Sequence, residues 1–410
     1  MPAQITAFTN GTIITPLRLI ENGTVLIEGE WIKVVGRKDQ ICIPENAEVI
    51  DVEGAYISPG FIDLHLHGAW GGDVMAATSN DLQKMAQGLV KNGVTSFLPT
   101  TLAGPLSDIE NAVNCIQLAA KMGFKGGAKI LGAHLEGPYF NKKQKGAQNP
   151  KYIINPQKEE YISILDKYPC IIRVSAAPEL PGSLVLGREL KKRGIVASIA
   201  HSNATYQEIL KAVEAGFTHV THIFSGMSGL ERVDAYRVAG VIESTLLIDE
   251  LTTEMIADGH HLPPSLMRLA LKTKGLEKIC LVTDSMSAAG LGPGVFNLGG
   301  LDVLVEANAP NSFEIPIQND NYVAKLMDRS SFASSVSTMD KMVKNMINVV
   351  GLNILEVIKL VTLNPARMQR LDQEIGIISA GMKADLAIFN EKIEIKMTIV
   401  DGKIAYQVAK

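Results

Sequence analysis

The segment FIDLHLHGAW, Phe61 to Trp70, carries two histidines, one residue apart, at the end of an apolar run. Alternate residues of a β-strand point to the same side, so the rings of His65 and His67 can reach one point. Seven further short apolar segments follow, separated by amphipathic helical segments. The eight predicted strands span residues 58–68, 93–101, 129–137, 170–179, 194–202, 218–226, 253–259 and 278–285. Eight strand–helix repeats predict an α/β fold, a parallel (β/α)8 TIM barrel.

The helices between these strands carry end signals in the sequence. Thr205 and Glu208 have the spacing of a capping box, in which each residue satisfies a backbone N–H of the first turn. Ser79 or Asn80 is predicted to cap the first barrel helix, and Gly93 is predicted to end it. These signals support helices between the strands.

The two ends of the chain differ from its middle. Residues 1–57 and 366–410 read as strands joined by tight turns, and neither end has enough strand to fold alone. Together they predict a small β-sandwich domain built from both termini, with the barrel spanning 58–365. Within the barrel, residues 296–325 break the strand–helix rhythm and are predicted to form an inserted β-structure.

Composition excludes several classes of protein. The 410 residues are 46% hydrophobic with a net charge of −4 and without a basic block, so nucleic acid and membranes are not expected partners. The four cysteines are far apart and form no CxxC, so neither disulfides nor a cysteine-ligated zinc is expected. The N-terminus does not resemble a signal peptide, and a cytoplasmic protein is expected.

Polar side chains gather at the carboxyl ends of the predicted strands. In a parallel barrel all of these ends open onto one face, where active sites are built. A single histidine there is more often a hydrogen-bonded core residue, but coincidence is a poor account of groups on five strand ends. The groups are His65, His67, Glu136, His201, His222 and Asp284. Imidazoles and carboxylates predict a divalent metal, Zn²⁺ foremost, with Fe²⁺, Mn²⁺ or Co²⁺ as alternatives.

Asp284 is the predicted catalytic residue. A carboxylate at the edge of a metal site can accept the proton of an attacking water and pass it to a leaving amine. Asp63 alternates with His65 and is predicted to orient a ligand ring. His219 lies three residues before His222, so it is predicted to pack outward against the helices. One of His260 and His261 is expected to reach the site.

Several motifs together resemble a known family. They are PGFIDLHLHG, GAHLEGPYFN, KGAQNP, IAHSNAT, VTHIFSGM, LVTDSMSAAG and the tail with NPAR and ADLAIFN. The chain is similar over nearly its whole length to the N-acetylglucosamine-6-phosphate deacetylase family of the amidohydrolase superfamily. The resemblance implies removal of acetate from the 2-amide of a phosphorylated sugar. It also implies a homodimer, with part of the phosphate site lent by the neighbouring subunit.

The same resemblance assigns individual roles. Glu136, His201 and His222 match the common metal ligands, while His65 and His67 match a pair that holds a second metal in some members. Asp284 matches the catalytic aspartate, and His261 matches a histidine that contacts substrate.

Substrate-facing positions depart from the family pattern. Gln148 stands where the family usually has histidine, Ser225-Gly226 replaces Asn-Ala, and Phe332 begins a segment that replaces Leu-Ala-Gly-Ser. The phosphate-binding arginine is expected at Arg232, with Arg237 as the rival. These positions are the predicted substrate contacts.

Alternative functions follow from those departures. The same hydrolysis of N-acetylgalactosamine 6-phosphate, or of an unphosphorylated amide, is the main alternative. A cyclic-amide hydrolase is disfavoured because the fourth strand offers no lysine, and a deaminase because PCxxC is absent. A non-catalytic binding protein on this fold is a further alternative, disfavoured because every expected metal ligand is present.

Overall fold

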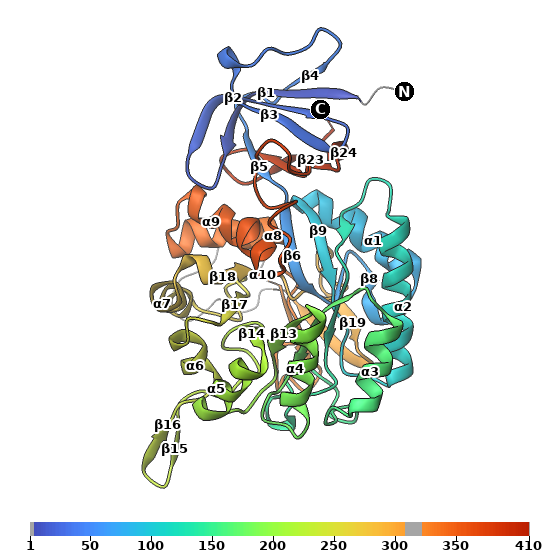
Figure 1. Cartoon of the computed structure of the whole chain (residues 1–410), viewed down its shortest axis with the longest axis vertical. Helices are drawn as coiled ribbons and strands as arrows, with labels where there is room; N and C mark the ends of the chain where they lie inside the picture. The colour runs from blue at the N-terminus through green and yellow to red at the C-terminus, as the bar shows by residue number, and fades with distance from the viewer. Residues whose placement is uncertain (1–3, 308–321, 410) are drawn as a thin grey trace.

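Both ends of the chain build one β-sheet, which lies at one end of the molecule (Figure 1). The computed structural model describes residues 4–307 and 322–409. The strands run in the order β24-β23-β22-β5-β1-β2-β3, with β4 beside β1. Their bounds are β1 Ile5–Ile14, β2 Leu19–Glu28, β3 Trp31–Arg37, β4 Glu48–Asp51, β5 Tyr56–Pro59, β22 Leu386–Phe389, β23 Ile395–Val400 and β24 Lys403–Gln407.

This terminal sheet has an apolar core of its own. Phe8, Ile57, Leu386 and Ile399 are almost fully buried within it. The antiparallel pairing of β22 with β5 joins the C-terminal strands to the N-terminal ones. A bridge between Trp31 and Lys383 brings the edge strand β3 back to the chain just before β22. The strands of the two termini therefore join in a single hydrogen-bonded sheet.

The middle of the chain forms a TIM-barrel-like domain with all eight predicted strands. The strands are β6 Phe61–Leu66, β9 Val94–Pro99, β11 Ala133–Glu136, β12 Ile171–Ala176, β13 Val196–Ile199, β14 Phe217–Val220, β17 Thr252–Met255 and β18 Ile279–Leu281. They lie in two parallel sheets, β10-β9-β6 with β10 Lys129–Ile130, and β11-β12-β13-β14-β17-β18. Parallel bridges from Thr100 to His134 and from Leu66 to Ser285 link the sheets at both edges.

Helices surround these strands (Figure 1). They are α1 Ser79–Leu89, α2 Leu106–Met122, α3 Lys158–Lys167, α4 Ser183–Arg193, α5 Tyr206–Ala215, α6 Val241–Leu247, α7 Pro264–Lys274, α8 Met339–Asn345, α9 Ile354–Val361 and α10 Leu363–Met368. Short helical turns are η1 Lys38–Gln40, η2 Val74–Ala76, η3 Val90–Asn92, η4 Lys142–Gln144, η5 Leu276–Lys278 and the π-turn η6 Met346–Val350. None of the helices in the described part of the chain is long and apolar enough to cross a membrane.

Three predicted helix ends can be compared with the structure. The carboxylate of Glu208 accepts a hydrogen bond from the Thr205 backbone N–H at 2.8 Å, as a capping box requires. The cap of α1 was predicted one or two residues too late, because the Thr78 hydroxyl accepts the Asp81 N–H at 3.1 Å. Gly93 follows η3 with φ of 81°, a left-handed conformation that glycine adopts without strain.

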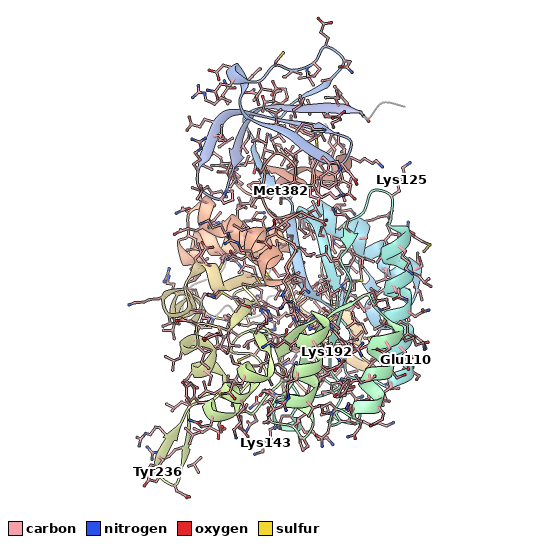
Figure 2. The ribbon with its side chains drawn as sticks, viewed as in Figure 1. Glu110, Lys125, Lys143, Lys192, Tyr236 and Met382 are labelled. Carbon is pink, nitrogen blue, oxygen red and sulfur yellow. The ribbon has the colours of Figure 1, made fainter. Side chains whose placement is uncertain are left out.

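Smaller β-structures follow strands of the barrel. The predicted insertion contains an antiparallel sheet of β19 Gly294–Leu298, β20 Leu301–Glu306 and β21 Val323–Leu326, while residues 308–321 of it lie outside the described chain. A hairpin of β15 Glu231–Val233 and β16 Tyr236–Val238 projects from the barrel after β14 (Figures 1 and 2). The strands β7 Gly68–Ala69 and β8 Gly72–Asp73 pair beside the end of β6.

Candidate metal centre

The predicted metal ligands meet at the carboxyl ends of the barrel strands. Because β6 begins directly after β5 of the terminal sheet, these ends point away from that sheet. Backbone hydrogen bonds from Asp284 N to His65 O (2.8 Å) and from His67 N to Ser285 O (2.8 Å) hold the ends of β6 and β18 together. The six residues from five separate segments therefore lie close together in the folded chain.

Glu136 lies at the centre of this group. Its Oε1 is 3.0 Å from His222 Nε2, and 3.5 Å from both His201 Nε2 and His65 Nε2. Its Oε2 is 3.5 Å from His67 Nε2. Burial opposes ionisation of Glu136, but the surrounding histidines, His65 foremost, outweigh it and hold the pKa of the carboxyl well below its usual range. Glu136 is therefore a buried carboxylate anion facing four imidazoles.

Asp284 lies on the other side of the same histidines. Its Oδ1 is 3.2 Å from His67 Nε2 and 3.7 Å from His65 Nε2. Burial raises the pKa of Asp284, but the charges of His65 and His67 outweigh this effect and lower it below the ordinary value. Asp284 is thus ionised at neutral pH and able to accept a proton.

The backbone is strained at three of these positions. His201, His222 and Asp284 have φ of 44°, 22° and 45°, in the left-handed region that non-glycine residues rarely adopt. Each follows the last residue of its strand by two or three positions, so the left-handed turn redirects the side chain there. Such conformations cost on the order of 1–3 kcal/mol each and persist where the surrounding structure enforces them, commonly at functional sites.

These residues fit a divalent metal. Two groups have ligand atoms within 4.8 Å of one another: His65, His67 and Asp284 in one, and His65, Glu136 and His222 in the other. Within residues 4–307 and 322–409, His65 Nε2 and Asp284 Oδ1 are buried without a hydrogen-bond partner. A buried polar atom without a partner is costly, and a cation between these atoms would satisfy both.

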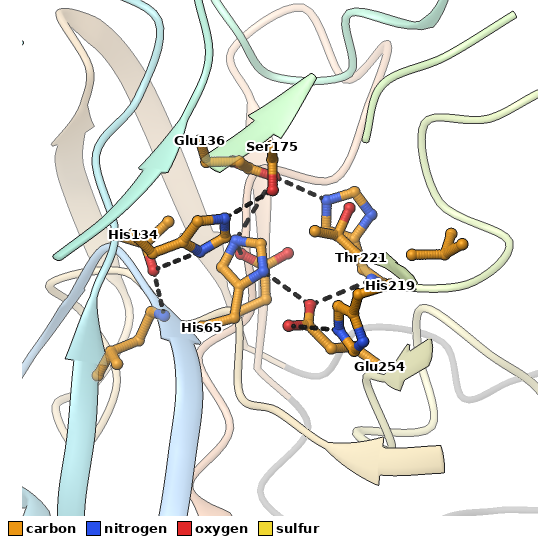
Figure 3. Close-up of polar contacts among 12 residues, drawn as sticks. His65, His134, Glu136, Ser175, His219, Thr221 and Glu254 are labelled. Atoms are coloured by element: carbon orange, nitrogen blue, oxygen red, sulfur yellow. Dashed lines mark hydrogen bonds and ion pairs between the residues drawn. The ribbon is translucent and has the colours of Figure 1, made fainter. Parts of the chain in front are cut away.

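A buried carboxylate beneath the ligands was missed from the sequence. Glu254 of β17 has its Oε2 2.9 Å from His65 Nδ1, and the same oxygen accepts the His222 backbone N–H at 3.3 Å. Its other oxygen, Oε1, forms an ion pair with Arg173 Nη1. The side chains of Glu254 and Arg173 are completely buried. We call Arg173, Glu254 and the rings of His65 and His219 the floor cluster. Figure 3 labels Glu254, His65 and His219 of this cluster.

The floor cluster corrects two predictions. His219 does not pack outward: its Nδ1 is 2.7 Å from Thr252 Oγ1 and its Nε2 is 3.3 Å from Glu254 Oε1. Asp63 does not orient a ligand ring, since its carboxylate accepts the Thr283 hydroxyl at 2.6 Å. Glu254 takes the orienting position instead. The alternation of side chains along β6 identifies only neighbours of His65 on the same strand. Glu254 lies on β17, far away in the sequence, so this pattern could not reveal it.

His134 is a further buried histidine that the sequence did not single out. Its Nε2 is 2.6 Å from Ser175 Oγ and its Nδ1 is 3.2 Å from Thr100 Oγ1. Its ring meets that of His65 edge to face with centroids 4.8 Å apart. Burial lowers the pKa of His134 well below its ordinary value, so the ring is neutral. The sequence did contain a signal for His134: it lies two residues before Glu136 on the same strand, so both side chains are expected on the same side.

A cavity of about 270 Å³ opens above the candidate ligands. The lining includes Glu136, His67, His201, His222 and Asp284 together with five of the predicted substrate contacts, Gln148, Ser225, Gly226, His261 and Phe332. His261 Nδ1 is 2.7 Å from Asp258 Oδ2, and the rings of His261 and Phe332 lie with centroids 5.0 Å apart. Burial lowers the pKa of His261, but Asp258 outweighs this effect and raises it overall.

Arg232 does not lie among the residues lining this cavity. It is exposed on β15, directly opposite Arg237 on β16, in the projecting hairpin. The two residues of the turn, Asp234 and Ala235, both have positive φ, as a two-residue hairpin turn of this hand requires. Within one copy of the chain, the hairpin thus carries both candidate arginines away from the metal centre.

Comparison with known proteins identifies the class. Residues 56–405 match the amidohydrolase family, and the chain belongs to that family. It is 33% identical over 398 residues to the N-acetylglucosamine-6-phosphate deacetylase of Bacillus subtilis, covering 96% of this chain and 95% of the relative. It is 31% identical over 363 residues to the N-acetylgalactosamine-6-phosphate deacetylase of Escherichia coli O157:H7, covering 88% and 91%.

Solved structures agree with these relatives. The N-acetylglucosamine-6-phosphate deacetylase of Pasteurella multocida superposes with a TM-score of 0.88 at 28% identity, covering 98% of this chain and 99% of that one. The enzyme of the same name from Thermotoga maritima gives 0.84 at 32% identity, covering 98% and 100%. The resemblance inferred from the motifs is confirmed, and the chain is a hydrolytic enzyme of the deacetylase type. The amidohydrolase superfamily is metal dependent, and this chain has candidate metal-binding groups.

Proposed function

We propose that this protein removes the acetyl group from an N-acetylated amino-sugar phosphate, foremost N-acetylglucosamine 6-phosphate, giving glucosamine 6-phosphate and acetate. The observation that carries the proposal is Asp284, an ionised carboxylate 3.2 Å from His67 that lines the cavity beside the candidate ligands. The near full-length similarity to deacetylases of such sugars supports the substrate class.

Glu136, His201 and His222 would hold the main metal, and His65 and His67 a second. Nitrogen and carboxylate ligands in a buried setting favour Zn²⁺, with Fe²⁺, Mn²⁺ and Co²⁺ as alternatives. When bound, the metal supplies Lewis-acid chemistry that polarises the amide carbonyl and makes a water molecule more acidic.

The protein's own residues would move the proton. Asp284 accepts a proton from the attacking water and then donates it to the departing amine, so that one carboxylate serves as base and then as acid. His261, fixed by Asp258, is placed to hydrogen-bond the substrate in the cavity. Ser225, Gly226 and Phe332 are the proposed contacts to the remainder of the sugar.

The hairpin would bind the phosphate of a neighbouring subunit's substrate. Arg232 and Arg237 are paired across its two strands, so their side chains emerge on the same face. Like charges directly opposite each other are destabilising unless an anion lies between them. Since one copy carries the hairpin away from its own cavity, we propose a homodimer in which each hairpin serves the partner's site.

The galactosamine epimer is the second candidate substrate. It is favoured by the 31% identity to an N-acetylgalactosamine-6-phosphate deacetylase, close to the identity with glucosamine enzymes. An unphosphorylated amide remains the alternative in which the two arginines have no role.

Acetate release from a panel of sugars tests the proposal. Metal-loaded protein would be supplied with both 6-phosphates and both unphosphorylated N-acetyl sugars. We expect one or both phosphates to be hydrolysed much faster than their unphosphorylated forms. Equal rates with and without phosphate would contradict the phosphate role of the hairpin, and no acetate release from any sugar would contradict the proposed function.

We also propose a domain organisation and a location for this protein. The links at both edges of the parallel sheets support a closed (β/α)8 barrel over residues 58–365, with the terminal domain made of 1–57 and 366–410. Four free cysteines support a reducing, cytoplasmic location.

A further inference from the structure

Gln148 is held at both ends of its side chain. It lies in the segment after β11, is 4% exposed, and lines the cavity. Its Oε1 accepts the Ala103 backbone N–H at 2.8 Å, and its Nε2 donates to Glu136 Oε2 at 2.9 Å. A backbone N–H can only donate and an ionised carboxylate can only accept, so these two partners fix which way the amide points.

This arrangement divides the two oxygens of Glu136. Gln148 donates to Oε2, which also lies 3.5 Å from His67 Nε2. Oε1 faces His222 Nε2 at 3.0 Å, and the ring nitrogens of His201 and His65 at 3.5 Å. Rotation of the Glu136 carboxylate would break the bond to Gln148, and the buried Nε2 would then lose its acceptor. A buried donor without a partner is unfavourable, and this restrains that rotation.

We propose that Gln148 is a positioning residue, which holds Glu136 with Oε1 turned toward the histidine pair His201 and His222. Gln148 was predicted to be a substrate contact, but its carbonyl end is committed to Ala103 and its amide end to Glu136. The inference rests on the proposed function only through Glu136 as a metal ligand.

The test is metal affinity of the full-length protein after its metal has been removed with a chelator. Gln148→Met keeps an unbranched side chain of similar length but has no N–H and no carbonyl. Outer contacts to metal ligands typically contribute 10–100-fold in metal affinity. We expect Gln148→Met to bind Zn²⁺ about 10–100-fold more weakly by calorimetric titration. We also expect an altered visible absorption spectrum with Co²⁺, which reports the geometry of the ligands.

A rescue variant and a matched control accompany it. Gln148→His retains one ring nitrogen that accepts and one that donates, so it should recover part of the affinity. Gln369→Met removes another buried glutamine, whose Nε2 donates to Ile172 O at 3.0 Å, and should leave metal binding unchanged. Thermal unfolding of the metal-free proteins identifies any variant that fails to fold, in which case Gln148→His is compared directly with the parent.

The outcomes separate positioning from substrate contact. Weaker metal binding with a KM for sugar that is nearly unchanged at saturating metal supports the proposal. Unchanged metal affinity and Co²⁺ spectrum with a raised KM would overturn it in favour of a substrate contact. If Gln148→Met misfolds, the folded Gln148→His decides. A Zn²⁺ affinity between that of the parent and that expected for Gln148→Met, with an altered Co²⁺ spectrum, supports the proposal. An affinity and spectrum equal to the parent's, or a loss as large as expected for Gln148→Met, overturns it. If the parent binds metal but hydrolyses none of the sugars, the proposed function is wrong. The metal affinities of the variants still show whether Gln148 positions Glu136.

Discussion

Two groups of charged side chains in this molecule differ in burial and in what their partners do. The floor cluster lies inside the barrel, where Glu254 pairs with Arg173 and also contacts His65 and the backbone of His222. The junction cluster joins the barrel to the terminal sheet, where Lys129 Nζ is 2.6 Å from Asp385 Oδ2 and 2.7 Å from Asp401 Oδ1.

The difference shows how to distinguish a charged side chain that only stabilises the fold from one that also positions candidate metal ligands: by what its atoms contact. At the junction Asp385 divides its two oxygens between Lys129 and the backbone N–H of Asp401, so its partners hold the two parts of the chain together and none of them is a candidate metal ligand. On the floor, Glu254 divides its two oxygens between a counter-ion and the candidate metal ligands. Replacing the floor pair can therefore preserve stability without preserving the ligand geometry.

The largest expected effect lies above the floor cluster. Asp284→Asn keeps the shape of the side chain but cannot accept a proton, so we expect acetate release to fall by about 10²–10⁴-fold. Unfolding by denaturant should show a stability close to that of the parent, because the amide still fits the site. Metal content measured on the same samples is the control. Hydrolysis at the parental rate would remove Asp284 from the mechanism.

Breaking the floor pair should give the largest loss of stability. Glu254→Leu leaves Arg173 buried without its counter-ion, and the free energy of unfolding should fall by about 3–5 kcal/mol. Arg173→Met combined with Glu254→Leu should recover most of this loss, while metal content stays low because His65 Nδ1 still lacks its partner. Full metal binding in the double variant would show that the floor cluster is merely structural.

The junction should respond less and should depend on pH. Lys129→Met should cost about 1–3 kcal/mol, because its side chain is 25% exposed and only Asp385 is left deeply buried. Burial already raises the pKa of Asp385 above 3.8, in spite of Lys129. The Asp385 carboxyl therefore holds its proton more tightly in the folded state than in the unfolded state. Its contribution to the free energy of unfolding is present at low pH and is lost as pH rises through the folded-state pKa.

Without Lys129 the folded-state pKa of Asp385 rises further. The loss of stability in Lys129→Met should therefore be smaller at pH 5 than at pH 8, as measured by denaturant unfolding at both values. A loss that is the same at both pH values would mean that Asp385 does not carry the effect.

The smallest effect is expected at an exposed ion pair on the terminal sheet. Lys33 Nζ lies 2.8 Å from Glu28 Oε2, with side chains 50% and 39% exposed. Lys33→Ala should change the free energy of unfolding by less than about 1 kcal/mol, since water screens such pairs. A loss as large as that of Lys129→Met would show that burial is not what separates these clusters.

The sequence by itself determined the elements of this protein and the residues that gather at one end of them. Apolar segments of strand length gave eight strands, and polar residues at their ends gave His65, His67, Glu136, His201, His222 and Asp284, which the structure brings together. This succeeded because strand ends of a parallel barrel share one face, whatever the details of pairing.

Only the tertiary structure decided which side chains meet inside the barrel. Glu254, Arg173 and His219 come from three different strands, and their meeting depends on strand tilt and register, which local periodicity does not contain. The outward direction predicted for His219 failed for the same reason, because counting from His222 assumed a regular strand. The backbone turns to positive φ at His222, two residues beyond the end of β14, and that turn reverses the alternation.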